Sequence, residues 1–174
     1  MKHFLIVVDM QKDFVDGALG TPEAVAIVPA VCERIRAFDG EIIVTYDTHP
    51  DTYLDTAEGK KLPVTHCVKE TDGWRLDAAV ASALEEKEYC AVEKPTFGSV
   101  ELPFLIQEMA GEEAFDITLI GLCTDICVVS NALLLKAHFP EVSIAVESAL
   151  CAGVTPETHA AALQTMTMCQ IDVK

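Results

Sequence analysis

A cysteine in the setting of a nucleophile lies in the run GLCTDICVVSNALLLKAHF. The apolar segment 115–121 before it is typical of a buried parallel strand. A helical pattern then begins near Thr124, and the side chain of Thr124 or Asp125 can cap its first turn. Cys127 is expected in that turn, where free N–H groups and the helix dipole lower a thiol pKa and can hold an oxyanion. The alternative is a small buried hydrophobic residue, since free cysteines are commonly buried.

Other reactive side chains lie at the ends of three further apolar runs. HFLIVVD ends at Asp9, EIIVTYDTH ends in Asp47 and His49, and EYCAVEK ends at Lys94. Open parallel sheets bind ligands at the carboxyl ends of their strands, so these side chains and the cysteine are expected around one crevice. Singly, a carboxylate can cap a turn and most lysines are solvated. Their joint position favours an active site.

Val/Ile-rich segments alternate with helical patterns along the chain. This alternation predicts an α/β fold, a three-layer α/β/α sandwich with a five- to six-stranded parallel sheet. Helices are expected at 22–38, 76–87, 101–110, 124–138 and 156–168. The 174 residues show no linker or repeat, so a single domain over 1–174 is expected. The long excursion 50–75 is expected to be functional.

A thiolate that attacks a carbonyl carbon needs a partner that manages protons and a site for the oxyanion. Asp9 lies at the end of the expected central strand and is the candidate general base and acid. Lys94 would keep Asp9 ionised and lower the pKa of Cys127 through its charge. These three residues form the predicted catalytic group.

A second group has the composition of a metal site. Asp47 and His49 are two apart at a strand end, so their side chains can face the same side. With His66 they offer two imidazoles and one carboxylate, which suit one divalent transition metal: zinc, iron or manganese. Glu58 is a candidate fourth ligand, and a solvated loop histidine is the alternative for His66. Neither GxGxxG nor GxxxxGK[ST] occurs, so no nucleotide or flavin cofactor is expected.

Composition excludes several classes of partner. The formal net charge of −16 argues against nucleic acid and anionic membranes. No apolar run reaches the length of a membrane span, and the N-terminal run is too short for a secretory signal. The seven cysteines are odd in number and lack a disulfide-rich pattern, which indicates reduced thiols and a cytoplasmic protein. A homo-oligomer is compatible with the sequence.

In their order and spacing, these motifs resemble the isochorismatase-like cysteine hydrolases, and among them the nicotinamidases. Asp9 in VDMQKDF, Lys94 in VEKPTF and Cys127 in GLCTDICV match the catalytic motifs. The Asp47-x-His49 pair followed by a later histidine matches the nicotinamidase metal site. The resemblance runs from residue 3 to about residue 168.

The resemblance implies an isochorismatase-like fold with a Rossmann-like strand order. It implies an oxyanion hole made by the backbone N–H groups of Cys123 and Cys127, and a cis Leu122–Cys123 peptide bond. It places Phe14 beside the substrate ring. A second ring-stacking aromatic, common three residues before the last metal histidine, is replaced here by Pro63.

The reaction implied by the resemblance is hydrolysis of a small carboxamide through a thioester, with nicotinamide and NAD salvage first in line. The metal would bind the pyridine nitrogen and orient the ring. The missing aromatic leaves open a related amidase for a carbamoyl, ureido or other small amide. A non-catalytic binding protein on the same fold would have no need of the three catalytic residues together. Metal content separates the first two hypotheses.

Overall fold

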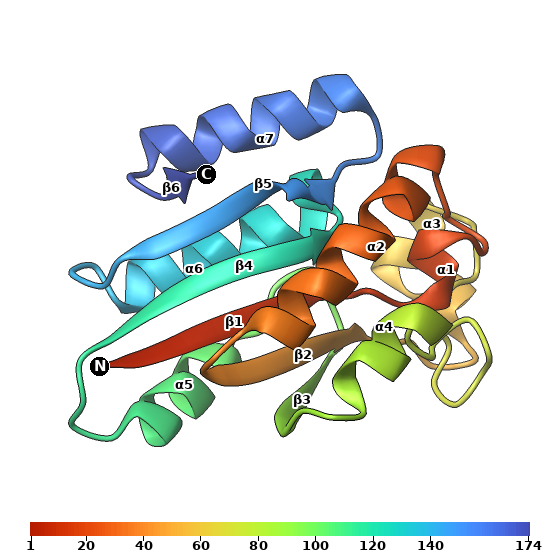
Figure 1. Ribbon diagram of the computed structural model, residues 1–174. Helices are drawn as coiled ribbons and strands as arrows, with labels where there is room; N and C mark the ends of the chain where they lie inside the picture. Colours follow the sequence, from red (N-terminus) through yellow and green to blue (C-terminus); the bar gives the residue numbers. More distant parts are fainter.

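The computed structural model describes all 174 residues and contains one six-stranded sheet in which all neighbouring strands are parallel. The strand order is β3-β2-β1-β4-β5-β6 (Figure 1). The strands are β1 (Lys2–Val8), β2 (Glu41–Asp47), β3 (Tyr89–Lys94), β4 (Phe115–Leu122), β5 (Ile144–Ala152) and β6 (Asp172–Val173). The predicted parallel α/β fold is confirmed, with the short β6 as its sixth strand.

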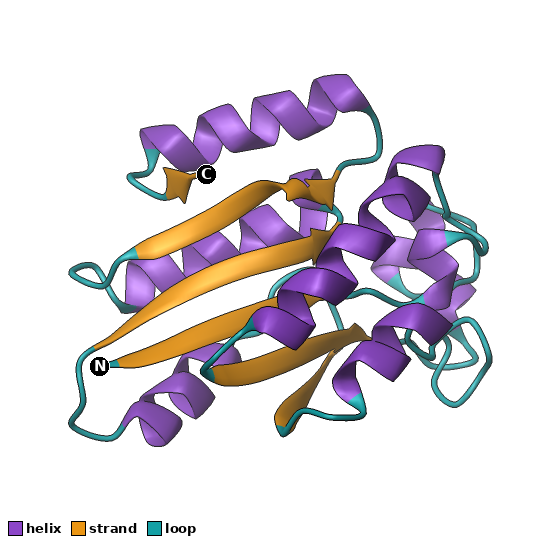
Figure 2. Cartoon of the chain, in the orientation of Figure 1, coloured by secondary structure: helices purple, strands orange, loops and turns teal.

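Helices cover both faces of the sheet (Figure 2). They are α1 (Lys12–Val15), α2 (Pro22–Ala37), α3 (Ala57–Lys61), α4 (Ala78–Leu84), α5 (Leu102–Ala110), α6 (Val129–His138) and α7 (Pro156–Met168). A 3-10 turn, η1 (Tyr53–Asp55), and a π-helical turn, η2 (Thr124–Val128), complete the set. None of the helices has the length and apolar character needed to cross a membrane.

The central strand β1 contributes to two hydrophobic cores. All five residues from Phe4 to Val8 are fully buried. Successive strand residues point to opposite faces, so Leu5 and Val7 pack with α2 and α4, whereas Ile6 packs with α5, α6 and α7. This double burial fixes the position of the residue that follows the strand.

Two predictions about helices are corrected. The helix expected at 76–87 is shorter, because α4 begins only after Asp77, whose side chain accepts hydrogen bonds from its first turn. The helix expected at 124–138 begins as the π-helical turn η2 and becomes α-helical at Val129. The other three predicted helices begin and end within one residue of their expected bounds.

The predicted capping of that helix is also wrong. The Thr124 hydroxyl lies 2.8 Å from Nδ1 of His159, and the Asp125 carboxylate accepts the N–H of Val154 at 3.1 Å. Neither side chain bonds to the first turn of η2. Both instead tie the turn to the segment that follows β5.

The excursion after β2 contains η1 and α3, and with α1 it lies at the carboxyl ends of the strands (Figure 1). The sequence did not indicate these short helices. They place a layer of side chains over the strand ends, where the site described below is found.

Candidate active site

The carboxylate of Asp9 is fully buried directly after β1. Its backbone φ is 48°, a left-handed conformation that aspartate tolerates better than most residues. Thr45 Oγ1 donates a 2.6 Å hydrogen bond to Oδ1. Oδ2 lies 2.6 Å from Nζ of Lys94 but accepts no well-aligned hydrogen bond. This second oxygen faces the lysine and is the candidate proton acceptor.

Lys94, the last residue of β3, extends its buried side chain to Asp9. Its ammonium group lies 3.5 Å from the sulfur of Cys127 and donates to the Thr96 carbonyl at 3.1 Å. Burial disfavours the charged lysine, but the negative charges of Asp9 and Asp47 outweigh burial and raise the pKa of Lys94. The lysine therefore remains a cation between the carboxylate and the thiol.

The thiol of Cys127 is buried in η2, beside these two groups. Burial and the negative charge of Asp9 raise the pKa of Cys127 above that of a free thiol, and Lys94 only partly opposes them. The lowered thiol pKa predicted from the sequence is therefore wrong for this state. The thiol keeps its proton and has a buried carboxylate next to it. Burial also raises the pKa of Asp9, which makes that carboxylate a better proton acceptor.

Asn131 holds the cysteine turn in place and was missed by the sequence analysis. It is fully buried. Its Nδ2 donates to the carbonyls of Cys127 at 2.8 Å and Phe97 at 3.2 Å, and its Oδ1 accepts the N–H of Ser99 at 2.9 Å. The signal available in the sequence was its spacing, since residues four apart share a helix face.

The backbone beside the thiol has an unused donor. The Leu122–Cys123 peptide bond is cis, as the resemblance implied. The N–H of Cys123 donates to no backbone or side-chain acceptor in the chain. Burial raises the pKa of the Cys123 thiol itself to about 12, so this second cysteine is neutral.

The four predicted metal ligands also converge. One ligand atom from each of Asp47, His49, Glu58 and His66 lies within 4.8 Å of the others. Nε2 of His49 is 2.9 Å and Nε2 of His66 is 3.5 Å from the same Asp47 oxygen. Burial opposes ionisation of Asp47, but hydrogen bonds from both histidines and the charge of Lys94 keep its pKa low.

Neighbouring groups orient these side chains. Nδ1 of His66 lies 2.7 Å from the Val64 carbonyl, which can only accept, so Nε2 is left free to face the other ligands. The buried Tyr53 ring packs against both histidines, with centroid distances of 4.7 and 4.9 Å. Gln11, also buried, accepts the N–H of Asp47 and donates to its carbonyl, both at 2.8 Å. No pattern in the sequence predicted that Gln11 and Tyr53 would support the metal-type ligands.

Two imidazoles and two carboxylates with oriented nitrogen atoms fit a divalent transition metal. The kinds of donor atom and their orientation are therefore suited to binding such an ion.

A cavity of about 40 Å³ joins the two groups. Cys127 lies on one side of it and Asp47, Glu58 and His66 on the other, with Phe14 in its wall. Pro63 is exposed, and its neighbour Leu62 lines the cavity in its place. The tryptophan, Trp74, packs on Tyr46 outside the cavity, with ring centroids 5.2 Å apart. The cavity thus offers one aromatic wall besides the histidines.

An isochorismatase-domain family model matches residues 3–173. The chain belongs to the isochorismatase family. A search of curated proteins found no match.

Several solved structures share this isochorismatase-family fold. The nicotinamidase/pyrazinamidase of Bacillus subtilis is 26% identical, with a TM-score of 0.85 and 99% of each chain covered. The pyrazinamidase/nicotinamidase of Streptococcus mutans is 25% identical, with a TM-score of 0.85, covering 99% of this chain and 100% of that one. A pyrazinamidase of Pyrococcus horikoshii, solved in complex with zinc, is 26% identical, with a TM-score of 0.83, covering 100% and 99%. The family and these likenesses identify the protein as a hydrolase.

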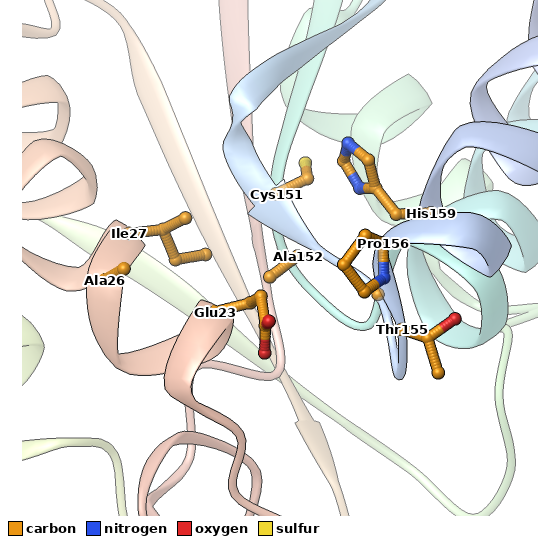
Figure 3. Close-up of a pocket in the computed structure, with 9 residues that line it drawn as sticks. Glu23, Ala26, Ile27, Cys151, Ala152, Thr155, Pro156 and His159 are labelled. Atoms are coloured by element: carbon orange, nitrogen blue, oxygen red, sulfur yellow. The ribbon is translucent and has the colours of Figure 1, made fainter.

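A larger hollow of about 280 Å³ lies away from the site of this isochorismatase-family protein, between α2 and the β5–α7 connection (Figure 3). Cys151 and His159 line it. The His159 ring is engaged with Thr124 through Nδ1. Burial raises the pKa of Cys151 to about 12, and no lysine is among the groups that shift it. The Glu23 carboxylate also lines this hollow, but no lysine or arginine does, so Cys151 lacks the carboxylate–lysine pair found beside Cys127.

Proposed function

We propose that the protein is a metal-dependent amidohydrolase that converts a small aromatic carboxamide into its acid and ammonia. Nicotinamide is the first candidate, which would place the enzyme in NAD salvage. The observation that carries the proposal is the buried contact of Asp9, Lys94 and Cys127 beside a cavity that is also lined by three of the four converging metal-type ligands. The likeness to three structures described as nicotinamidases or pyrazinamidases supports it.

In the first half of the reaction, Cys127 forms a bond from its sulfur to the carboxamide carbon. Its proton passes to Oδ2 of Asp9, the carboxylate oxygen that lies 2.6 Å from the Lys94 ammonium. Lys94 stays charged and stabilises the carboxylate before transfer and the thiolate after it. Asp9 then delivers the proton to the amide nitrogen and the carbon–nitrogen bond breaks. Ammonia departs, and the acyl group remains on Cys127 as a thioester.

In the second half, Asp9 takes a proton from a water molecule that attacks the thioester carbon. The carbon–sulfur bond breaks, the proton returns to Cys127, and the acid is released. One carboxylate thus acts as base and acid in turn. The negative charge on the carbonyl oxygen would be held by the backbone N–H groups of Cys123 and Cys127, and the donor of Cys123 has no competing acceptor.

Asp47, His49 and His66, with Glu58 as the fourth ligand, would hold the metal. When bound, the metal supplies a Lewis acid that ligates a ring nitrogen and orients the substrate. Phe14 would pack on the substrate ring, because it lines the cavity between the two groups. The proposed ion is zinc, iron or manganese.

The lack of a second ring beside the cavity favours one alternative. A carbamoyl, ureido or other small amide needs no stacking partner. For such a substrate, Leu62 would be as suitable a contact as an aromatic side chain. Stacking adds about 0.5–1.5 kcal/mol beyond burial, roughly one decade of affinity at most. Its loss lowers affinity without excluding nicotinamide. The seven free cysteines are consistent with a reducing compartment, for which we propose the cytoplasm.

A panel of small amides assayed for ammonia release tests this proposal. Nicotinamide should be hydrolysed faster than benzamide, which has the same ring shape but no ring nitrogen. Equal rates would contradict metal-anchored binding. Faster release from a ureido compound than from either would support the alternative substrate class.

A further inference from the structure

An apolar chamber adjoins the reaction cavity. It has a volume of about 200 Å³, compared with about 40 Å³ for the cavity beside the thiol. The two spaces share part of their walls: Phe14, Leu19, Leu62, Cys123 and Ile126. The chamber is therefore about five times as large as the cavity with which it shares this wall. Ligand pockets typically measure about 300–1,000 Å³, so the cavity beside the thiol is small by itself.

The chamber has a wall of its own, formed by Ala24 of α2, Leu122 of β4, and Gly153 and Val154 after β5. No charged side chain lines it. The Thr21 hydroxyl in this wall already accepts the N–H of Ala24 as a helix cap. The neutral thiol of Cys123 faces both spaces. A charged or strongly polar group in this chamber would lose its hydration and gain at most the Thr21 hydroxyl as a partner, whereas burial of an apolar group would be favourable.

The strand order places the chamber on the opposite side of the thiol from the metal group. Along the sheet edge, Asp47 ends β2, Asp9 follows β1, Cys127 follows β4, and Val154 follows β5. A ring whose carboxamide is at Cys127 and whose nitrogen faces Asp47 would direct its other edge toward Val154.

We propose that the preferred substrate is an aromatic carboxamide with an apolar substituent on the ring edge away from the metal, and that this chamber binds the substituent. The inference rests on the proposed amidohydrolase function and narrows its substrate class. A pyridine-3-carboxamide with a short alkyl chain at ring position 5 has the required geometry. The ring nitrogen at position 1 and the alkyl chain at position 5 are both meta to the carboxamide, on opposite sides of it.

The test compares nicotinamide, 5-propylnicotinamide and 5-carboxynicotinamide by ammonia release from the metal-loaded enzyme. Each buried methylene is worth about a fourfold gain, so the propyl compound should have a kcat/KM at least about tenfold above nicotinamide. The carboxylate-bearing compound should be poorer than nicotinamide. If the propyl compound is hydrolysed no better than nicotinamide, the proposal that the chamber binds a ring substituent is wrong. The amidase proposal is unaffected by that result.

Filling the chamber should remove the preference. Ala24 and Val154 line the chamber but not the reaction cavity. Ala24→Leu adds three carbon atoms to the chamber wall and should abolish the gain from the propyl group. Nicotinamide turnover should stay within about twofold, because nicotinamide does not reach into the chamber. Val154→Trp gives a second route if Ala24→Leu does not fold, since Val154 is 50% exposed. Val25→Trp, at a position 48% exposed that does not line the chamber, is the matched control and should keep the preference. Loss of preference in the control as well would overturn the assignment.

Binding separates failure of the chamber from failure of the amidase proposal. Calorimetry on Cys127→Ala, with and without Ala24→Leu, measures affinity without turnover. Tighter binding of 5-propylnicotinamide than of nicotinamide, lost with Ala24→Leu, supports the chamber even if no amide is hydrolysed. Equal binding of the two compounds overturns it, whatever the enzyme hydrolyses.

Discussion

Cys127 and Cys151 are two thiols on neighbouring parts of the same sheet edge, and they are almost equally buried, at 4% and 5% exposure. Cys127 has the carboxylate of Asp9 and the ammonium of Lys94 beside it. Cys151 pairs across the sheet with Gly121 and has neither. Burial raises the pKa of both thiols, so burial does not distinguish them. What differs is a base that can take the proton and a cation that can stabilise the thiolate.

Removing each thiol in turn should give the largest contrast. Cys127→Ala should lower ammonia release by about 10⁴-fold or more, the scale seen when a nucleophile is removed from a catalytic group that works as a unit. Cys151→Ala should leave turnover within a few fold. Circular dichroism checks that both variants fold. Equal losses of activity in the two variants would show that the neighbours of Cys127 do not make it the nucleophile.

The neighbours of Cys127 should be nearly as important as the thiol. Asp9→Asn and Lys94→Ala should each lower kcat by roughly 10²–10⁴-fold, since the first removes the proton acceptor and the second removes the charge that stabilises the thiolate. Because the residues act as a unit, the double variant should lose little more than either single one. Lys94→Ala should also lower the free energy of unfolding by about 3–5 kcal/mol, because Asp9 is left buried without its partner. Near-normal turnover in either single variant would remove that residue from the mechanism.

Loss of a metal-type ligand should affect metal content and substrate binding rather than the bond-breaking step. His49→Ala should lose the divalent metal, of which one per chain is expected by elemental analysis, and should bind the ring poorly. His138→Ala is the matched control, because His138 packs between Phe104 and Phe139 away from the site. Full activity in wild-type protein without metal, unaffected by a chelator, would instead favour the ureido or carbamoyl alternative.

The smallest effect is expected from the hydrogen bond that positions Asp9. Thr45→Val removes the 2.6 Å hydrogen bond to the Asp9 carboxylate and should cost about tenfold in kcat, since such a bond to a charged group is worth about 1.5–3 kcal/mol. The effect should appear in kcat rather than KM. Thr118→Val on β4, also buried, is the control and should be close to wild type. A change in KM alone would assign Thr45 to substrate binding.

Strand alternation made the parallel fold predictable, and the residues at strand ends indicated which candidate side chains lie close together. Asp9 follows β1, Lys94 ends β3 and Cys127 lies in the turn after β4, and parallel topology brings the ends of these strands to one edge. The buried residues that hold the site in place were not predictable. Gln11 and Asn131 are polar residues whose burial depends on packing between distant segments. The sign of the Cys127 pKa shift was missed for the same reason. A sequence shows a helix start, but not how deeply the thiol is buried or how close Asp9 lies to it.

The central claim is that hydrolysis passes through an acyl group on Cys127. Rapid acid quenching of the enzyme during turnover of nicotinamide, followed by peptide mass mapping, tests it most directly. The account predicts added acyl mass on the peptide that contains Cys127, none on the peptide that contains Cys151, and no ammonia release from Cys127→Ala. An acyl group on a different residue, or ammonia release at the wild-type rate by Cys127→Ala, would contradict it.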